Sequence, residues 1–305
     1  MKRMLLLFLP FSLVTHNIDE NNISNDSEGF FVNSLNVVQT NKIIYSFNEN
    51  DNLPDTYFSF KSLKWGATGH RVVGEIASSY LTCKAKKNIR KILGTESIAI
   101  SSNWADFVKS DSTMNYLSSW HYINLKSGMN YSEFEAYLQK DTITDAFTRL
   151  NFLITELKDK QLPLDKKQMY LRLLIHIVGD IHQPMHVSRA EDQGGNKIKV
   201  LWFNEPTNLH AVWDDKLIES QKLSYTEFAT SINHTDKQQR KAWQKQLMSE
   251  WLFESYQLAD MLYSGITQPD QKLGFRYNYD HVATLNSQLL KGGVRLAGLL
   301  NEIFR

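Results

Sequence analysis

Hydrophobic residues recur at helical spacing along most of the chain that follows Trp65. Val72, Ile76 and Tyr80 share one helical face, and Gly94 is a suitable stop for this segment. Pro184 has no N–H donor and disfavours helix at the residue before it, so the helix that precedes it ends near His182. The same spacing predicts further helices over residues 144–158, 164–182, 236–264 and 282–304.

A glycine-rich turn and a short extended segment interrupt the helical pattern in the second half of the chain. Gly194-Gly195-Asn196 predicts a tight turn, and residues 198–203 alternate enough for a short strand. Thr207 or Asn208 is a suitable cap for the helix that follows. No internal repeat is evident. We therefore expect a mainly α-helical chain with one domain over residues 65–305.

The first 64 residues have a different character. Residues 1–15 begin with Lys2 and Arg3 and continue with an apolar stretch of eleven residues, which predicts an export signal. A membrane-spanning helix needs about 20 apolar residues, and no later segment has them, so we expect no membrane span. Residues 16–64 are predicted to be a poorly ordered leader or linker. The protein is accordingly expected to be exported, either periplasmic or secreted.

Composition narrows the possible functions. A formal net charge of +1 argues against a protein that binds nucleic acid through a broad basic surface, so phosphate binding requires a local site. The single cysteine, Cys83, excludes an internal disulfide. We predict that Cys83 is a small core residue and not a nucleophile.

The candidate chemistry centres on residues 176–186, whose sequence is His-Ile-Val-Gly-Asp-Ile-His-Gln-Pro-Met-His. His176 and Asp180 are four residues apart and project from one face of a helix. Imidazole and carboxylate together suit zinc and similar cations. The alternative interpretation is a helix end whose histidines donate hydrogen bonds to the backbone.

Other segments also carry candidate histidine and aspartate ligands, each beside a bulky residue or near the start of a predicted helix. His210 and Asp214 repeat the spacing of four, and Asp106 and His121 each lie next to or near a tryptophan. His70 precedes the first predicted helix. Each signal alone is weak, but their joint occurrence is difficult to assign to core packing.

These motifs, in this order, resemble the zinc-dependent single-strand nucleases of the S1/P1 type, which include the plant bifunctional nucleases. The matching segments are Trp-Gly-x-x-Gly-His, Trp-Ala-Asp, Trp-His-Tyr-Ile, His-x-x-x-Asp-x-His-Gln-Pro-x-His, Gly-Gly-Asn, Asn-Leu-His-x-x-Trp-Asp and the C-terminal residues 293–301. The resemblance implies a mainly α, single-domain, multi-helix architecture of the phospholipase C/nuclease type around a three-zinc cleft.

The resemblance also implies how three zinc ions are held. One zinc takes Asp106, His121, His176 and Asp180, and a second takes His186, His210 and Asp214. The third takes His70, a shared oxygen of Asp180, and the terminal amine and carbonyl of Trp65. This last site requires cleavage between Lys64 and Trp65. His182 is not a family ligand, so a supporting or structural role is expected for it.

Substrate roles follow from the same resemblance. Asp106 is expected to orient the attacking water or accept its proton, and Lys109 to stabilise the charge that grows on phosphate. The alternative for Lys109 is a solvated helix lysine. Tyr122 matches an aromatic residue that stacks on a base, which favours single strands because a duplex hides its base faces. Asn124 stands where some relatives use aspartate to bind a base edge, so base preference is expected to differ.

The predicted function is an exported zinc-dependent endonuclease that hydrolyses single-stranded DNA and RNA to 5′-phosphate products. Additional 3′-nucleotidase activity is left open. The expected partner is single-stranded nucleic acid or a nucleotide, and no obligate protein partner is evident. The alternatives are a zinc phospholipase C of the same architecture and a non-catalytic helical binding protein. A di-iron oxidoreductase would require Glu-x-x-His pairs that the candidate ligand set lacks.

Overall fold

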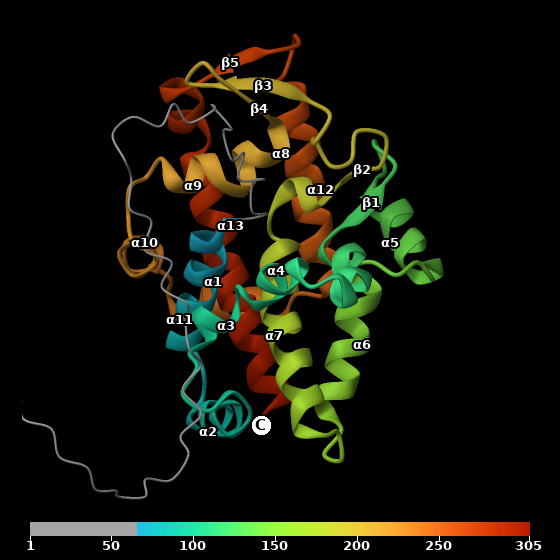
Figure 1. The fold of residues 1–305 in the computed structure, drawn as a ribbon, viewed down its shortest axis with the longest axis vertical. Helices are drawn as coiled ribbons and strands as arrows, with labels where there is room; N and C mark the ends of the chain where they lie inside the picture. Colours follow the sequence, from blue (N-terminus) through green and yellow to red (C-terminus); the bar gives the residue numbers. More distant parts are fainter. Residues whose placement is uncertain (1–65) are drawn as a thin grey trace, which may run out of the picture. The chain divides into compact units, whose positions relative to one another are not determined.

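The computed structural model describes residues 66–305, in which helices predominate (Figure 1). The predicted mainly α-helical fold is confirmed for these residues. The predicted export signal, the leader and Trp65 lie outside the described residues, so the predicted division of the chain into segments stays a prediction. None of the described helices combines the length and the apolar character that crossing a membrane requires.

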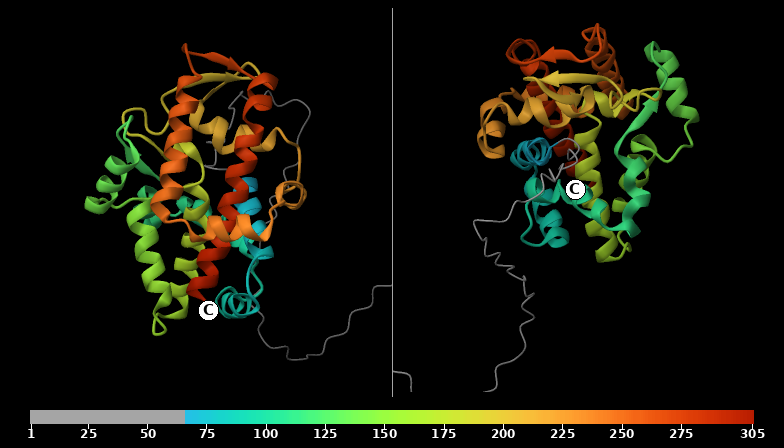
Figure 2. Two further views of the ribbon diagram at one scale, coloured as in Figure 1. Left: turned by 180° about the vertical axis from the view of Figure 1, so that it is seen from behind. Right: turned by 45° about the horizontal axis from the view of Figure 1, so that its top comes forward.

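The C-terminal helix α13 (Phe275–Ile303) organises the helical core. It packs against α1 (Ala67–Ser79), α7 (Leu164–Asp180) and α11 (Lys237–Lys245), and the two views of Figure 2 show it running beside them. Close approach of α13 to α1 depends on Gly293, because a Cβ at this position would lie 2.5 Å from Ile76. Both α1 and α7 carry candidate ligands, so this contact sets the scaffold of the site.

The remaining helices surround this core. Helix α6 packs on α7, α10 packs on α1, and α12 contacts α5 and the segment that follows α7. Their bounds are α2 Cys83–Leu93, α3 Ile98–Ser101, α4 Trp104–Phe107, α5 Tyr131–Lys140, α6 Ala146–Lys158, α8 Leu209–Ala211, α9 Leu217–Glu219, α10 Tyr225–Ile232 and α12 Met248–Ser264. Other helical types connect them. Three are 3-10 helices, η1 Val108–Ser110, η2 Ser112–His121 and η3 Pro184–His186, and η4 Val212–Lys216 is a π-helix.

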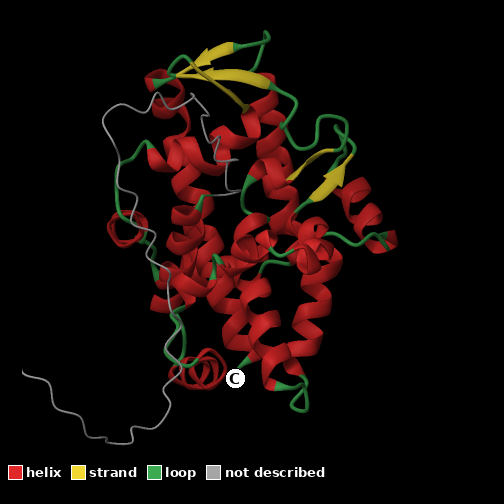
Figure 3. Ribbon diagram, in the orientation of Figure 1, coloured by secondary structure: helices red, strands yellow, loops and turns green. Residues whose placement is uncertain are grey.

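Within residues 66–305, five short strands form two small sheets (Figure 3). Strand β1 (Ile123–Leu125) pairs in parallel with β2 (Val187–Arg189), with Ile123 opposite Val187. Strand β3 (Lys199–Trp202) lies between antiparallel β4 (Glu205–Asn208) and parallel β5 (Gln271–Leu273). The predicted strand over residues 198–203 is therefore confirmed. The β1–β2 pair matters most for the site, because it places the residues after His121 beside those after His186.

Several predicted helices are confirmed and two are divided. The helices over 144–158 and 164–182 agree with α6 and α7 within two residues, and Asn208 caps α8 by accepting from the N–H of Ala211. The segment that ends at Gly94 is not one helix. It breaks after Ser79, and the Thr82 side chain caps a new helix, α2.

The prediction of one helix over residues 236–264 is likewise wrong. Leu247 adopts an extended conformation between α11 and α12, and its N–H donates to the Glu250 carboxylate. The last helix begins at Phe275, seven residues before the predicted start. Cys83 is exposed at the first residue of α2, which corrects the expectation of a core cysteine. Local spacing did not reveal these breaks because capping and packing decide them.

The cap of α6 predicts a pH dependence of stability. Burial, together with the neighbouring Asp141, raises the pKa of Asp145 from 3.8 to about 7. The folded chain therefore binds more protons than the unfolded chain between these values, so stability falls as pH rises from about 4 to about 7. Asp145→Asn keeps a good cap but does not ionise. We expect the melting temperature of the variant to exceed that of the wild type at pH 8 by more than at pH 4.5.

Asp236→Asn is the matched control, because Asp236 caps α11 in the same way but is exposed. A variant Asp145→Asn whose melting temperature tracked the wild type at every pH would contradict the prediction.

Candidate metal centre

The last turn of α7 carries two wholly buried polar side chains, His176 and Asp180. The helix ends at Asp180, and Pro184 then starts the tight turn η3. This turn ends at His186, which is also buried. The sequence His-x-x-x-Asp followed by Gln-Pro therefore brings three candidate ligands to one place through a helix, a three-residue link and a turn.

The Asp180 carboxylate lies at the centre of the candidate ligands. Its Oδ2 is 2.9 Å from Nδ1 of His121 and 3.1 Å from Nε2 of His176. Its Oδ1 is 3.1 Å from Nδ1 of His186 and 3.5 Å from Nε2 of His70. One buried carboxylate therefore faces four imidazoles that come from four different elements.

A second group contains His186, His210 and Asp214. Nε2 of His186 is 3.1 Å from Oδ1 of Asp214, and Nε2 of His210 is 3.0 Å from its Oδ2. The amide of Gln183 also donates to Oδ1 of Asp214. The spacing of four between His210 and Asp214 brings them together as predicted, although a π-helical turn and not a regular α-helix carries Asp214.

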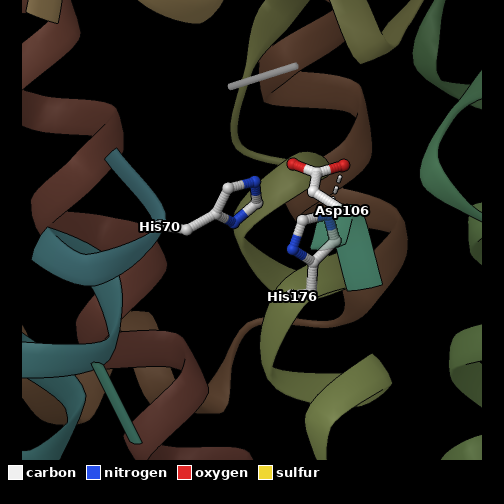
Figure 4. Close-up of side chains that lie close together, drawn as sticks. All are labelled: His70, Asp106 and His176. Atoms are coloured by element: carbon white, nitrogen blue, oxygen red, sulfur yellow. Dashed lines mark ion pairs between the residues drawn. The ribbon is translucent and has the colours of Figure 1, made fainter. Parts of the chain in front are cut away.

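A third group contains His70, Asp106 and His176. Figure 4 shows the imidazole of His70 extending from α1 toward that of His176 on α7, with the Asp106 carboxylate of α4 beside His176. The two rings are stacked with centroids 3.8 Å apart, and Oδ1 of Asp106 is 3.8 Å from Nε2 of His176. Lys109 donates to the Asp106 carboxylate. All eight candidate ligands within the described residues thus lie in three adjoining groups. His176 belongs to the first and the third group, and the contact between Asp180 and His186 joins the first group to the second.

Backbone carbonyls hold three of the imidazoles in place. Nδ1 of His176 donates to the carbonyl of Ser102 (2.6 Å), Nδ1 of His186 to that of His121 (2.9 Å), and Nδ1 of His210 to that of Gly194 (2.7 Å). Each bond fixes the proton on Nδ1 and leaves Nε2 directed at a carboxylate. Metal-binding histidines in proteins are held in this way. The three carbonyls have no signal in the sequence apart from the Gly-Gly-Asn turn.

The surroundings of Asp180 and His121 favour the forms of these two side chains that bind metal. Burial alone would raise the pKa of Asp180, but His176, His186 and His121 hold it well below its usual range. Burial lowers the pKa of His121 to about 3, so this imidazole is neutral, the form that binds metal. Tetrahedral ligands at the usual zinc distances lie about 3.3–3.5 Å apart, close to the separations around Asp180. The residues present therefore fit the metal that the chemistry implies.

A pocket of about 440 Å³ opens beside the second group. It is lined by Tyr122 and Asn124, by His186 and His210, and by the turn at Gly194 and its neighbours. The two residues predicted to contact substrate therefore share a cavity with two candidate ligands. Tyr122 follows His121 directly, and the β1–β2 pairing brings this segment beside His186.

A model of the S1/P1 Nuclease family matches residues 65–305. The chain belongs to the S1/P1 nuclease family. Endonuclease 3 of Arabidopsis thaliana is 30% identical over 264 residues, which cover 80% of this chain and 90% of that protein. Nuclease P1 of Penicillium citrinum is 28% identical over 282 residues, which cover 78% and 97%. Nuclease S1 of Aspergillus oryzae is 30% identical over 172 residues, which cover 53% and 57%.

Membership of the S1/P1 family confirms the resemblance and identifies the activity class. The chain is a metal-dependent nuclease, a hydrolase that acts on phosphodiester bonds of nucleic acids. This decides against a zinc phospholipase C and against a non-catalytic binding protein.

The Gly-Gly-Asn turn of this nuclease predicts a selective loss of metal. Gly194 has φ +62°, and an added Cβ would clash with the carbonyl oxygen of Met185. Gly194→Ala should displace the carbonyl that holds His210. We expect the variant to lose metal from the group of His186, His210 and Asp214, as measured by elemental analysis after dialysis against a weak chelator.

Gly128→Ala is the matched control, because Gly128 also has positive φ (+80°) but an added Cβ there meets nothing within 4 Å. It should lower stability by about 1 kcal/mol and keep its metal. Equal metal content in both variants would show that the turn does not hold His210.

Proposed function

We propose that this nuclease cleaves single-stranded DNA and RNA endonucleolytically with three zinc ions and leaves 5′-phosphate ends. The observation that carries the proposal is the buried Asp180 carboxylate within 3.5 Å of four imidazoles, beside a pocket lined by Tyr122.

The proposed ligand sets are those that the family resemblance implies, and two of the groups support them, because His121, His176 and Asp180 lie together, as do His186, His210 and Asp214. One zinc is assigned to Asp106, His121, His176 and Asp180, a second to His186, His210 and Asp214, and a third to His70, Asp180 and Trp65. When bound, zinc supplies positive charge for the phosphodiester and makes water nucleophilic near neutral pH. The ion pair between Lys109 and Asp106 supports a joint role, in which Lys109 holds the phosphate oxygens and Asp106 orients the attacking water.

Selectivity for single strands is assigned to the pocket beside the second group. Tyr122 offers a ring on which a base stacks, worth about 1–3 kcal/mol per base, and duplex DNA does not present such a face. Asn124 presents an amide, which both donates to and accepts from a base edge. Because the pocket adjoins His186 and His210, a base held there places its phosphate beside the proposed zinc ligands.

Asp180→Asn tests the metal assignment. The amide removes the negative charge that the four surrounding imidazoles and two proposed zinc ions share. We expect zinc content and the rate of single-stranded DNA cleavage to fall together, the rate by at least about 100-fold. Glu302→Gln is the control, since it makes the same chemical change in an exposed ion pair with Lys158.

Activity of Asp180→Asn near the wild-type level would refute the assignment. Wild-type protein that cleaves duplex DNA as fast as single strands would refute the proposed substrate preference, even if the metal assignment stood.

The proposal also includes export and cleavage before Trp65. Cleavage is required because an uncut chain offers Trp65 only as an amide, which is a poor ligand. Gly66, the first described residue, lies beside the second group, since its N–H donates to the carbonyl of Asp214. N-terminal sequencing of the mature, active protein should read Trp-Gly-Ala-Thr. A fully active protein that retained residues before Trp65 would show that the third metal is bound differently.

A further inference from the structure

The C-terminal run Gly293–Arg295 of α13 belongs to the motifs shared with the family, yet it supplies no candidate ligand. Arg295 is only 1% exposed, so its charge is buried in the helical core. A buried guanidinium requires several acceptors, because an unpaired buried charge is strongly destabilising. The partners of Arg295 therefore show what this motif does.

Arg295 binds the one histidine of residues 176–186 that is not a candidate ligand. Its Nη1 is 2.9 Å from Nε2 of His182, and its Nη2 donates to Gln246 and Glu254, each at 2.7 Å. A guanidinium can only donate, so Nε2 of His182 accepts. The proton of His182 is then on Nδ1, which donates to the carbonyl of Val178 at 2.7 Å. The arginine thus sets both the tautomer and the orientation of this imidazole.

Helices α12 and α13 also hold the backbone of the same link. The amide of Gln288 donates to the carbonyl of His182 (2.9 Å), and the hydroxyl of Ser255 donates to that of Ile181 (2.6 Å). Carbonyls at the end of a helix have no partner within the helix. The two donors, Ser255 and Gln288, are buried, and so are Ile181 and His182. Water therefore does not replace these bonds.

The link is the part of the chain that sets the spacing between two metal groups. Asp180 ends α7 and His186 ends η3, and the three residues Ile181, His182 and Gln183 connect the two elements. The fit of His182 against α13 is close, because a Cβ at Gly292 would lie 3.3 Å from Cγ of His182. A rotation of this imidazole would therefore move the link, and the link would move Asp180 and His186.

We propose that Arg295, Gln288 and Ser255 form a clamp that positions the zinc-binding turn between Asp180 and His186, acting through His182 as a neutral acceptor. The clamp explains why a histidine that binds no metal lies among those that do. It rests on the proposed zinc ligands, but its failure is distinguishable from theirs. Arg295 is a positioning residue and touches neither substrate nor metal.

The test compares His182→Leu, His182→Gln and Arg295→Met in the mature protein, which is proposed to begin at Trp65. Leucine removes the acceptor for Arg295, whereas the glutamine oxygen can replace Nε2. Zinc affinity is measured by competition with a chelator at a temperature well below each variant's melting point, and the ligand geometry by the visible spectrum of the Co²⁺-substituted protein. We expect His182→Leu and Arg295→Met to weaken zinc binding about 10–100-fold and to change the spectrum. His182→Gln should restore most of both.

Asn301→Leu is the matched control on the same helix. Asn301 accepts from the N–H of Thr82 (2.7 Å) and donates to the carbonyl of Tyr80 (3.0 Å), and so joins α13 to the end of α1. Its loss should lower the melting temperature and leave zinc affinity and the cobalt spectrum unchanged.

The outcomes separate a clamp from ordinary core packing. If Arg295→Met and His182→Leu behave like Asn301→Leu, the proposal is wrong and the network only stabilises the fold. If Arg295→Met fails to fold, the pair His182→Leu and His182→Gln decides, and equal zinc affinity in the two overturns the proposal. Wild-type protein that binds no zinc would refute the proposed function instead.

Discussion

The structure depends on one wholly buried carboxylate, that of Asp180, and on the imidazoles that face it. An ionised carboxylate without solvent is costly unless charged or hydrogen-bonding partners replace the water. Asp180 has such partners from α1, η2, α7 and η3. These elements must therefore meet at the end of α7, and the rest of the chain is arranged so that they do.

Rigid helices alone do not satisfy this requirement, because the ligands approach from several directions. The long helices α1, α7 and α13 form a packed scaffold, and short irregular turns supply His121, His186 and Asp214 at its edge. Hydrogen bonds from other parts of the chain hold these turns in place. Backbone carbonyls hold the imidazoles, and side chains of α12 and α13 hold the link after α7. The metal groups are thus pre-organised by the protein and not by the metal alone.

The same arrangement explains how a protein with almost no net charge can act on a polyanion such as nucleic acid. The net charge of +1 argues against attraction of nucleic acid through a broad basic surface. Charge is instead concentrated where imidazoles and carboxylates suit a divalent cation, next to Lys109 and to the pocket lined by Tyr122 and Asn124. The residues proposed to contact phosphate and those proposed to contact a base are therefore close to the same candidate metal groups.

The sequence by itself determined the features that depend on a few neighbouring residues. Helical spacing and caps predicted α6, α7 and the start of α8, and the spacing of four predicted that His176 would lie near Asp180 and His210 near Asp214. Tertiary structure decided the rest.

Packing divided two predicted helices, exposed Cys83, and grouped Asp106 with His70 and His176. It also joined Arg295 to His182 across 113 residues. Periodicity describes only which face of an element is apolar, whereas contacts between distant residues depend on how all the elements pack together.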